Sequence, residues 1–427
     1  MDESTYERYL DILREELIPA LGCTEPIAIA YGAATARDAL GAFPSGVKVH
    51  CSGNIIKNVK SVVVPNTGGL KGIEVSALAG IAGGNAGHGM EVLSHLEKRH
   101  ALKISELLEA GVCQVSALDS EKSLHIIIEV SAGQDSAKVE IQDFHTNITK
   151  IEKNGRTVYE KPTSSGNYLG TLTDRSILNV EDIFHFAETV DIAKARDLIK
   201  RQIAYNMAIA GEGLEGHYGV NIGATLLNYG PHSIFNKMKA YTASASEARM
   251  SGSELPVVTN SGSGNQGIAS SVPVIIYARE NGIDEERLIR ALLLSNLLTI
   301  HQKTLIGRLS AFCGVVSAAC SSGAAITYLA GGSLEQIKMT ITNTLANVSG
   351  IVCDGAKPSC GIKIAASLDA AMMAHLLALD NKAYLPGDGL VKENIEDTIS
   401  SVGRMARDGM KKTDEQILEI MLERTKN

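Results

Sequence analysis

Residues 309–325 (LSAFCGVVSAACSSGAA) and 347–367 (NVSGIVCDGAKPSCGIKIAAS) hold four of the seven cysteines within a long stretch of helical periodicity. Both segments are rich in small residues, which favour closely packed helices. From about residue 179 to the end, apolar residues recur at helical intervals, and Gly, Pro and Asn separate the segments. We therefore predict an all-helical domain over residues 175–427, with helices that include 266–281, 284–305 and 309–330.

The earlier part of the chain has a different pattern. Residues 46–160 contain the short β-branched runs VKVHC, SVVVP, LHIIIEV, AKVEI and RTVYE, with helical segments near 74–84 and 103–111. Strands mixed with helices predict a mixed α/β domain, which we place with the N-terminal helices in residues 1–165. The turn-rich segment 161–176 is the expected linker. The predicted fold class is α+β.

Length, composition and charge narrow the classes of function. A chain of 427 residues predicts two or three domains. The net charge is −8, aromatic residues make up 4%, and no basic run occurs, which argues against nucleic acid as a partner. The N-terminus has no signal-peptide pattern, and the longest apolar runs are short or interrupted. We expect a cytoplasmic protein without membrane partners, and allow for a homodimer.

The clustered cysteines are candidate metal ligands, because an odd count without a secretion signal disfavours disulfides. Gly355 and Pro358 predict a loop in which Cys353 and Cys360 can converge, and Cys360 opens a helix over 361–380, whose dipole favours a thiolate. In a single helix Cys320 would lie about 10.5 Å along the axis from Cys313. We therefore assign Cys320 to packing.

Thiolates are ligands of iron–sulfur clusters and also suit zinc. Cys313, Cys353 and Cys360 would be three ligands, which leaves one metal position open, as in catalytic sites. An exposed iron acts as a Lewis acid toward a substrate oxygen or sulfur. The alternative is three unrelated buried cysteines.

A glycine-rich segment, TNSGSGNQGIASSVPV (259–274), precedes an apolar helix. Such a loop can present backbone N–H groups to an anion, and we expect a substrate carboxylate because no G-K-[ST] follows. The alternative is a helix-entry turn without a ligand. The candidate binding residues are Ser261, Gly262, Ser263, Gly264, Asn265 and Gln266.

Two further candidates lie outside these segments. In LGCTEPIAIAYG, Thr24 or Glu25 can begin a helix, so that Cys23 lies near a helix N-terminus, where a thiol pKa tends to fall. A thiolate there is a candidate base or cluster ligand; the alternative is a buried cysteine beside the cap. His145 lies in the polar turn DFHTNIT.

The chain resembles the L-cysteine desulfidase and iron–sulfur L-serine dehydratase-like family over nearly its whole length. The motifs that carry this resemblance are GCTEP, DFHTN, NSGSGNQGI and the pair FCGVV and CDGAKPSC. It is most similar to the single-chain desulfidase branch, since GCTEP replaces the Ser-His-Thr turn of the dehydratases. The interval from Cys353 to Cys360 is shorter than in those dehydratases.

The resemblance implies a [4Fe–4S] cluster on Cys313, Cys353 and Cys360, and a pocket between the domains for a small amino acid. It implies that His145 and residues 261–266 lie near the substrate carboxylate. No cysteine follows Cys360, so a C-terminal thiol cannot close the cluster, but Cys23 could. We also count Thr24 and Glu25 among the substrate-binding candidates.

The implied reaction is β-elimination by a lyase, from L-cysteine to sulfide, ammonia and pyruvate, with Cys23 as the candidate catalytic base. L-Serine dehydration by the same machinery is the alternative. A pyridoxal-phosphate dehydratase would need a Schiff-base lysine early in an α/β fold, and the helical second half does not fit one. A non-catalytic metal or iron–sulfur sensor would bind metal without forming pyruvate.

Overall fold

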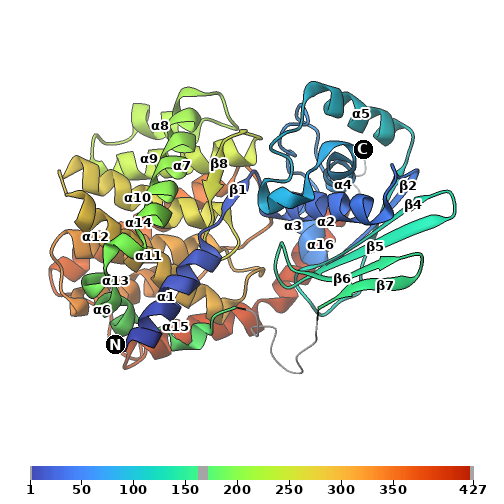
Figure 1. The fold of residues 1–427 in the computed structure, drawn as a ribbon. Coiled ribbons are helices and arrows are strands. Elements are labelled where there is room, and N and C mark those ends of the chain that lie inside the picture. The colour runs from blue at the N-terminus through green and yellow to red at the C-terminus, as the bar shows by residue number, and fades with distance from the viewer. Residues whose placement is uncertain (1, 162–171, 424–427) are drawn as a thin grey trace.

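The computed structural model describes residues 2–161 and 172–423, which form an α/β region and a larger helical region (Figure 1). The predicted α+β class is confirmed. Most of the predicted linker, and the predicted boundary at residue 165, lie in 162–171, outside the described residues.

The α/β region is built on a six-stranded sheet in the order β3-β2-β4-β5-β6-β7, parallel between β2 and β3 and antiparallel elsewhere. Its strands are β2 (Gly46–Cys51), β3 (Cys113–Ala117), β4 (His125–Ala132), β5 (Asp135–Gln142), β6 (Ile148–Lys153) and β7 (Arg156–Glu160). Alternate residues of β4 are buried, as expected when one face of a sheet packs on a core. Helices α2 (Thr24–Leu40), α3 (Gly53–Val59), α4 (Ile73–Gly83) and α5 (Lys98–Glu109) complete the region.

One predicted strand is wrong. The run SVVVP, residues 61–65, lies between α3 and α4 and forms only an isolated bridge from Val63 to Lys71. Its neighbours Val62 and Val64 are buried. The β-branched residues of this run are therefore buried without forming a strand. Strands β3 and β6 were not anticipated.

The helical region surrounds α10, α11 and α12, which are buried over most of their surface. The region contains α6 (Val180–Thr189), α7 (Arg196–Glu215), α8 (Ile222–Tyr229), α9 (Ile234–Met250), α10 (Gly264–Glu280), α11 (Glu285–Ile306), α12 (Gly314–Leu329), α13 (Leu334–Asn347), α14 (Cys360–Leu379) and α15 (Ile395–Arg404). Of the described helices, α14 alone is long and apolar enough to cross a membrane by length and composition, and 56% of its apolar 18-residue window is buried in the protein.

Each end of the chain packs on the region that is built mainly from the other part of the sequence (Figure 1). Helix α1 (Glu3–Glu16) places Tyr9 and Leu13 in the helical core. Helix α16 (Lys411–Leu422) returns to the α/β region, where Asp414 forms an ion pair with the buried Lys57 of α3. The proposed domain limits of 1–165 and 175–427 stay a prediction.

A short antiparallel ribbon joins the regions. Strand β1 (Pro19–Leu21) pairs with β8 (Pro256–Val258), and the backbone N–H of Thr259 continues the pairing by donating to Ile18. Cys23 follows β1 almost directly, and the glycine-rich loop follows β8. The ribbon therefore places the N-terminus of α2 beside the N-terminus of α10.

Candidate functional site

Four cysteines line one cavity between the two regions, and three of them, Cys313, Cys353 and Cys360, belong to the helical region. Cys313 is the N-cap of α12 and Cys360 is the first residue of α14. Cys353 lies on an extended segment paired with the one that carries Cys313: the N–H of Cys313 donates to Ile351 O at 2.8 Å, and that of Cys353 to Ala311 O at 2.7 Å. This backbone pairing, and two helix N-termini, bring the thiols together.

The environment stabilises negative charge on one of these thiols, Cys353, while burial raises the pKa of Cys360. A hydrogen bond from the Cys313 thiol, with the charges of Lys57 and Lys363, lowers the pKa of Cys353 to about 6, although burial opposes the shift. The same hydrogen bond and burial raise the pKa of Cys313. Lys303 of α11 is also buried at the cavity wall, and burial lowers its pKa to about 8 while Cys353 and Cys313 act in the opposite direction.

The donor set has the chemistry of an iron–sulfur site, because thiolates are the usual ligands of such clusters. Within residues 2–161 and 172–423, no group of three or more His, Cys, Asp or Glu side chains is close enough to hold one metal ion. A cluster of several irons spaces its thiolate ligands more widely, and three thiols here face a shared cavity. Lys57, Lys303 and Lys363 supply positive charge that would offset the thiolates.

The opposite wall comes from the N-terminus of α2, where Glu25 accepts three hydrogen bonds. Its Oε2 accepts from the Cys23 thiol at 3.0 Å and from Thr24 Oγ1 at 3.1 Å, and its Oε1 accepts from Asn58 Nδ2 at 2.8 Å. His145 Nε2 lies 3.9 Å from Oε1, too far for a hydrogen bond but within ion-pair distance. Burial raises the pKa of Glu25, but His145 and the Cys23 hydrogen bond outweigh burial and hold it well below its usual range.

The expected fall in the Cys23 pKa at the helix N-terminus is not observed. Cys23 is the N-cap of α2, but it is buried, and its thiol donates to a carboxylate. Burial, and then the charge of Glu25, raise the pKa of Cys23 well above its ordinary value; the charge of Arg249 acts in the opposite direction. The partial charge of a helix end is too small to reverse loss of solvation beside a carboxylate.

The glycine-rich loop forms the third wall. Ser261 and Gly262 take left-handed backbone conformations, with φ of 50° and 78°, and Asn260 pairs with Ser263 before α10 begins. Ser261, Gly262, Ser263, Asn265 and Gln266 line the cavity. Gly264 does not line it, although it was a candidate for substrate binding. The other sequence candidates that line the cavity are Cys23, Thr24, Glu25, His145, Cys313, Cys353 and Cys360.

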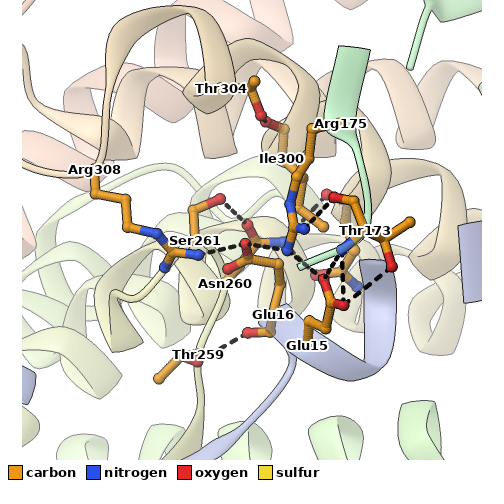
Figure 2. A network of polar contacts seen from close by, with 11 residues as sticks. Glu15, Glu16, Thr173, Arg175, Thr259, Asn260, Ser261, Ile300, Thr304 and Arg308 are labelled. Carbon is orange, nitrogen blue, oxygen red and sulfur yellow. Dashed lines mark hydrogen bonds and ion pairs between the residues drawn. The ribbon is translucent and has the colours of Figure 1, made fainter. Parts of the chain in front are cut away.

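A polar network outside the cavity holds this loop in place (Figure 2). The buried Glu16 accepts from Arg175 at 3.0 Å and from Arg308 at 2.5 Å, and its backbone carbonyl accepts from Thr259 Oγ1. Figure 2 shows Glu16 between the two guanidinium groups. Arg308 reaches the cavity wall, with its guanidinium 4.4 Å from the centre of the Phe144 ring.

Sequence reasoning did not identify Arg249, Lys303, Arg308 or Asn58, which also line the cavity. One signal was available for Arg249. It lies in ASASEARM, at the end of a segment of small residues, where a charged side chain is unusual on a buried helix. Lys303 similarly ends an apolar run, LLTIHQK.

Comparison with known proteins gives a consistent result. A family model described as serine dehydratase alpha chain matches residues 87–419. A UPF0597 protein of Treponema denticola is 51% identical over 427 residues, which cover 99% of each chain. Another, of Lachnoclostridium phytofermentans, is 50% identical over 98% of this chain and 100% of the relative. The UPF0597 protein of Desulfitobacterium hafniense is 49% identical over 98% of this chain and 97% of the relative. The relatives therefore also cover α2 and α3, which precede the family match.

Proposed function

Because the chain belongs to the serine dehydratase alpha chain family, we propose that it is a lyase that catalyses β-elimination on a small L-amino acid, with L-cysteine as the substrate. L-Cysteine and water would give sulfide, ammonia and pyruvate. The observation that supports this most is one cavity with three thiols on one wall and with Cys23, Glu25, His145 and the glycine-rich loop on the others.

Cys313, Cys353 and Cys360 would hold a [4Fe–4S] cluster. When bound, the cluster would supply an open iron that acts as a Lewis acid toward the β-thiol of the substrate. Lys303, buried beside Cys313 and Cys353, would offset the negative charge of the thiolates and of the departing sulfide. Cys313 and Cys360 are buried, which would limit the access of water to the reacting groups.

The other two walls would bind and orient the substrate. The backbone N–H groups at the start of α10, with His145, would stabilise the carboxylate and so lower the cost of removing the α-proton. Ser261 and Gly262 place these donors at the cavity wall through their left-handed conformations. Thr24 and Glu25 form the part of the wall that faces the substrate's amino end.

Cys23 is the proposed base. Its Sγ–H donates to Glu25 Oε2, so Cys23 would accept the α-proton after this thiol proton has passed through Glu25 Oε2 to water. Burial makes the resulting thiolate strongly basic, which suits the removal of a weakly acidic C–H proton. The Cα–H electron pair would then form the Cα–Cβ double bond as the Cβ–S bond breaks. The aminoacrylate released would tautomerise and hydrolyse to pyruvate and ammonia.

L-Serine is the second candidate substrate, and the family description favours it. The same residues would remove the α-proton, and water would leave in place of sulfide. We also propose a cytoplasmic location, because a reducing compartment keeps thiols available for a cluster.

Anaerobic reconstitution with iron and sulfide, followed by assays of pyruvate and sulfide from L-cysteine and L-serine, tests the proposal. We expect pyruvate from at least one substrate, and little from a Cys313→Ala variant. Cys320→Ala is the matched control, because Cys320 is buried in the helical core and does not line the cavity. No pyruvate from either amino acid with a fully loaded protein would overturn the lyase proposal.

A further inference from the structure

Buried polar atoms without a hydrogen-bond partner gather at the cavity. In the described residues, eleven buried side-chain nitrogen or oxygen atoms have no partner. Five of them belong to Asn58, His145, Arg249 and Gln266, and all four residues line the cavity. Unpaired buried polar atoms are costly, so their concentration in one place indicates a polar ligand.

Arg249, near the end of α9, carries two of these atoms. Its side chain is buried, with 3% of the residue exposed, and Nη1 donates to Asn265 Oδ1 at 3.1 Å. Nε and Nη2 have no partner among the described residues. These two N–H groups form one edge of the guanidinium, the geometry that binds both oxygens of a carboxylate.

Gly264 explains how the guanidinium reaches this position. A Cβ at Gly264 would lie 2.4 Å from Arg249 Nε, closer than any side chain can approach. Glycine is therefore needed at the first residue of α10 so that Arg249 can lie against the helix N-terminus. Gly264 contributes by admitting the guanidinium and does not itself face the cavity.

Asn58 supplies an acceptor on another wall. Its Nδ2 donates to Glu25 Oε1, and an ionised carboxylate can only accept, so this contact fixes the orientation of the amide. Asn58 Oδ1 is then a buried acceptor without a partner. An ammonium group, which has three donors and no acceptor, is the complementary ligand.

We propose that Arg249 binds the α-carboxylate of the substrate through Nε and Nη2, and that Asn58 Oδ1 accepts a hydrogen bond from its α-ammonium. The cavity would then select free amino acids with both ends ionised, and would reject amides, esters and peptides. This assignment rests on the proposed function only in taking the ligand to be an amino acid.

L-Alanine tests the assignment because it has both charged ends but no leaving group. Calorimetric titration of the anaerobically reconstituted protein should show L-alanine binding on the order of 10²-fold tighter than L-alaninamide, which lacks the carboxylate, or L-lactate, which lacks the ammonium. Arg249→Met should weaken L-alanine by on the order of 10²-fold and abolish its advantage over L-alaninamide. Arg249→Lys should retain part of the advantage of L-alanine over L-alaninamide. The lysine ammonium keeps the positive charge but cannot bind both carboxylate oxygens side by side.

Three further variants make the test specific. Asn58→Leu should remove the advantage of L-alanine over L-lactate, and Gly264→Ala should act in the same direction as Arg249→Met. Arg279→Met, which changes an exposed arginine at the end of α10, should alter nothing. Thermal melting would establish that each variant is folded.

Two outcomes would overturn the assignment: a wild-type protein that does not discriminate between the three ligands, or an Arg249→Met variant that still prefers L-alanine to L-alaninamide. Arg249-dependent binding of L-alanine without any pyruvate formation would refute the lyase proposal and leave this assignment intact.

Discussion

Two buried polar clusters meet at the start of α10, and they differ in how their atoms are paired. Behind the loop, Asn296 Oδ1 accepts from Gln202 and Asn260, and its Nδ2 donates to Gln202 and to the Leu292 carbonyl. We call Gln202, Asn206, Asn260 and Asn296 the asparagine network. Asn206 completes it by exchanging hydrogen bonds with the Val258 backbone. The cavity in front of the loop contains similar amide and charged groups, but several of their atoms lack partners.

This difference separates a scaffold from a site. The asparagine network satisfies its polar atoms within the protein, so it contributes rigidity and fixes the loop after β8. The cavity leaves its polar atoms for a ligand, so it contributes little to stability until one is bound. Removing a group from the first cluster should therefore change folding, and removing one from the second should change chemistry.

The largest expected effect is at the thiols. Cys353→Ala should abolish cluster binding and reduce pyruvate formation by about 10³-fold or more, equivalent to about 4 kcal/mol or more. Iron content per chain and pyruvate formation measure this. Cys320→Ala, a buried cysteine outside the cavity, should keep its iron. A Cys353→Ala protein with a full iron content would contradict the ligand assignment.

The next largest effect is on folding. Asn296→Ala should lower the free energy of unfolding by about 3 kcal/mol, because it leaves Gln202 buried without a partner and removes one of the hydrogen bonds of Asn260. Urea unfolding followed by circular dichroism measures this. A change below about 0.5 kcal/mol would show that the asparagine network is not a scaffold.

Replacing a cavity residue should affect catalysis more than folding. His145→Asn should lower kcat/KM by roughly 100-fold, about 2.7 kcal/mol, because a group near the carboxylate is removed. Its free energy of unfolding should fall by less than that of Asn296→Ala, because Nε2 has no hydrogen bond to lose and only its ion-pair contact with Glu25 at 3.9 Å is removed. The comparison between site and scaffold fails if this variant is strongly destabilised.

The smallest effect concerns pH and a third cluster, at the other end of α12. His375 Nδ1 lies 2.9 Å from Thr327 Oγ1, and burial lowers the pKa of His375 from 6.5 to about 4. The unfolded chain binds this proton more readily, so the stabilisation is present above pH 6.5 and is lost as pH falls from 6.5 to 4. We expect a loss of about 2 kcal/mol across this range.

Unfolding free energies of the wild type and of His375→Gln at pH 7 and pH 4.5 measure this contribution. The variant should lose less stability than the wild type on acidification. Equal losses would mean that other groups account for the acid sensitivity.

Periodicity predicted the long buried helices well, because repeated apolar positions record burial directly. The predicted helices 266–281, 284–305 and 361–380 correspond closely to α10, α11 and α14. The helix predicted over 309–330 begins later, at Gly314, because Cys313 pairs its backbone with Ile351. A pairing between distant segments leaves no periodic signal.

The parts of the site that contain clustered cysteines or glycines could be predicted from the sequence. The single side chains that reach the site from other helices could not. Cys313, Cys353 and Cys360 and the glycine-rich loop have recognisable local patterns, His145 was identified through the family resemblance, and all of them contribute to one cavity. Arg249 and Asn58 reach it from α9 and α3, and only three-dimensional packing brings them there. Gly264 lies in the glycine-rich loop, but its contact with Arg249 is seen only in the structure. Its role in admitting the guanidinium could therefore not be predicted from the sequence.

The ribbon of β1 and β8 has a consequence for the order of events during synthesis. A ribosome extends the chain from its N-terminus, so β1 is made long before β8, and Cys360 is made after Cys313 and Cys353. A nascent chain therefore lacks the complete set of three thiols until Cys360 has been made. The iron of the proposed cluster would then be delivered only after both strands of the ribbon are available to pair.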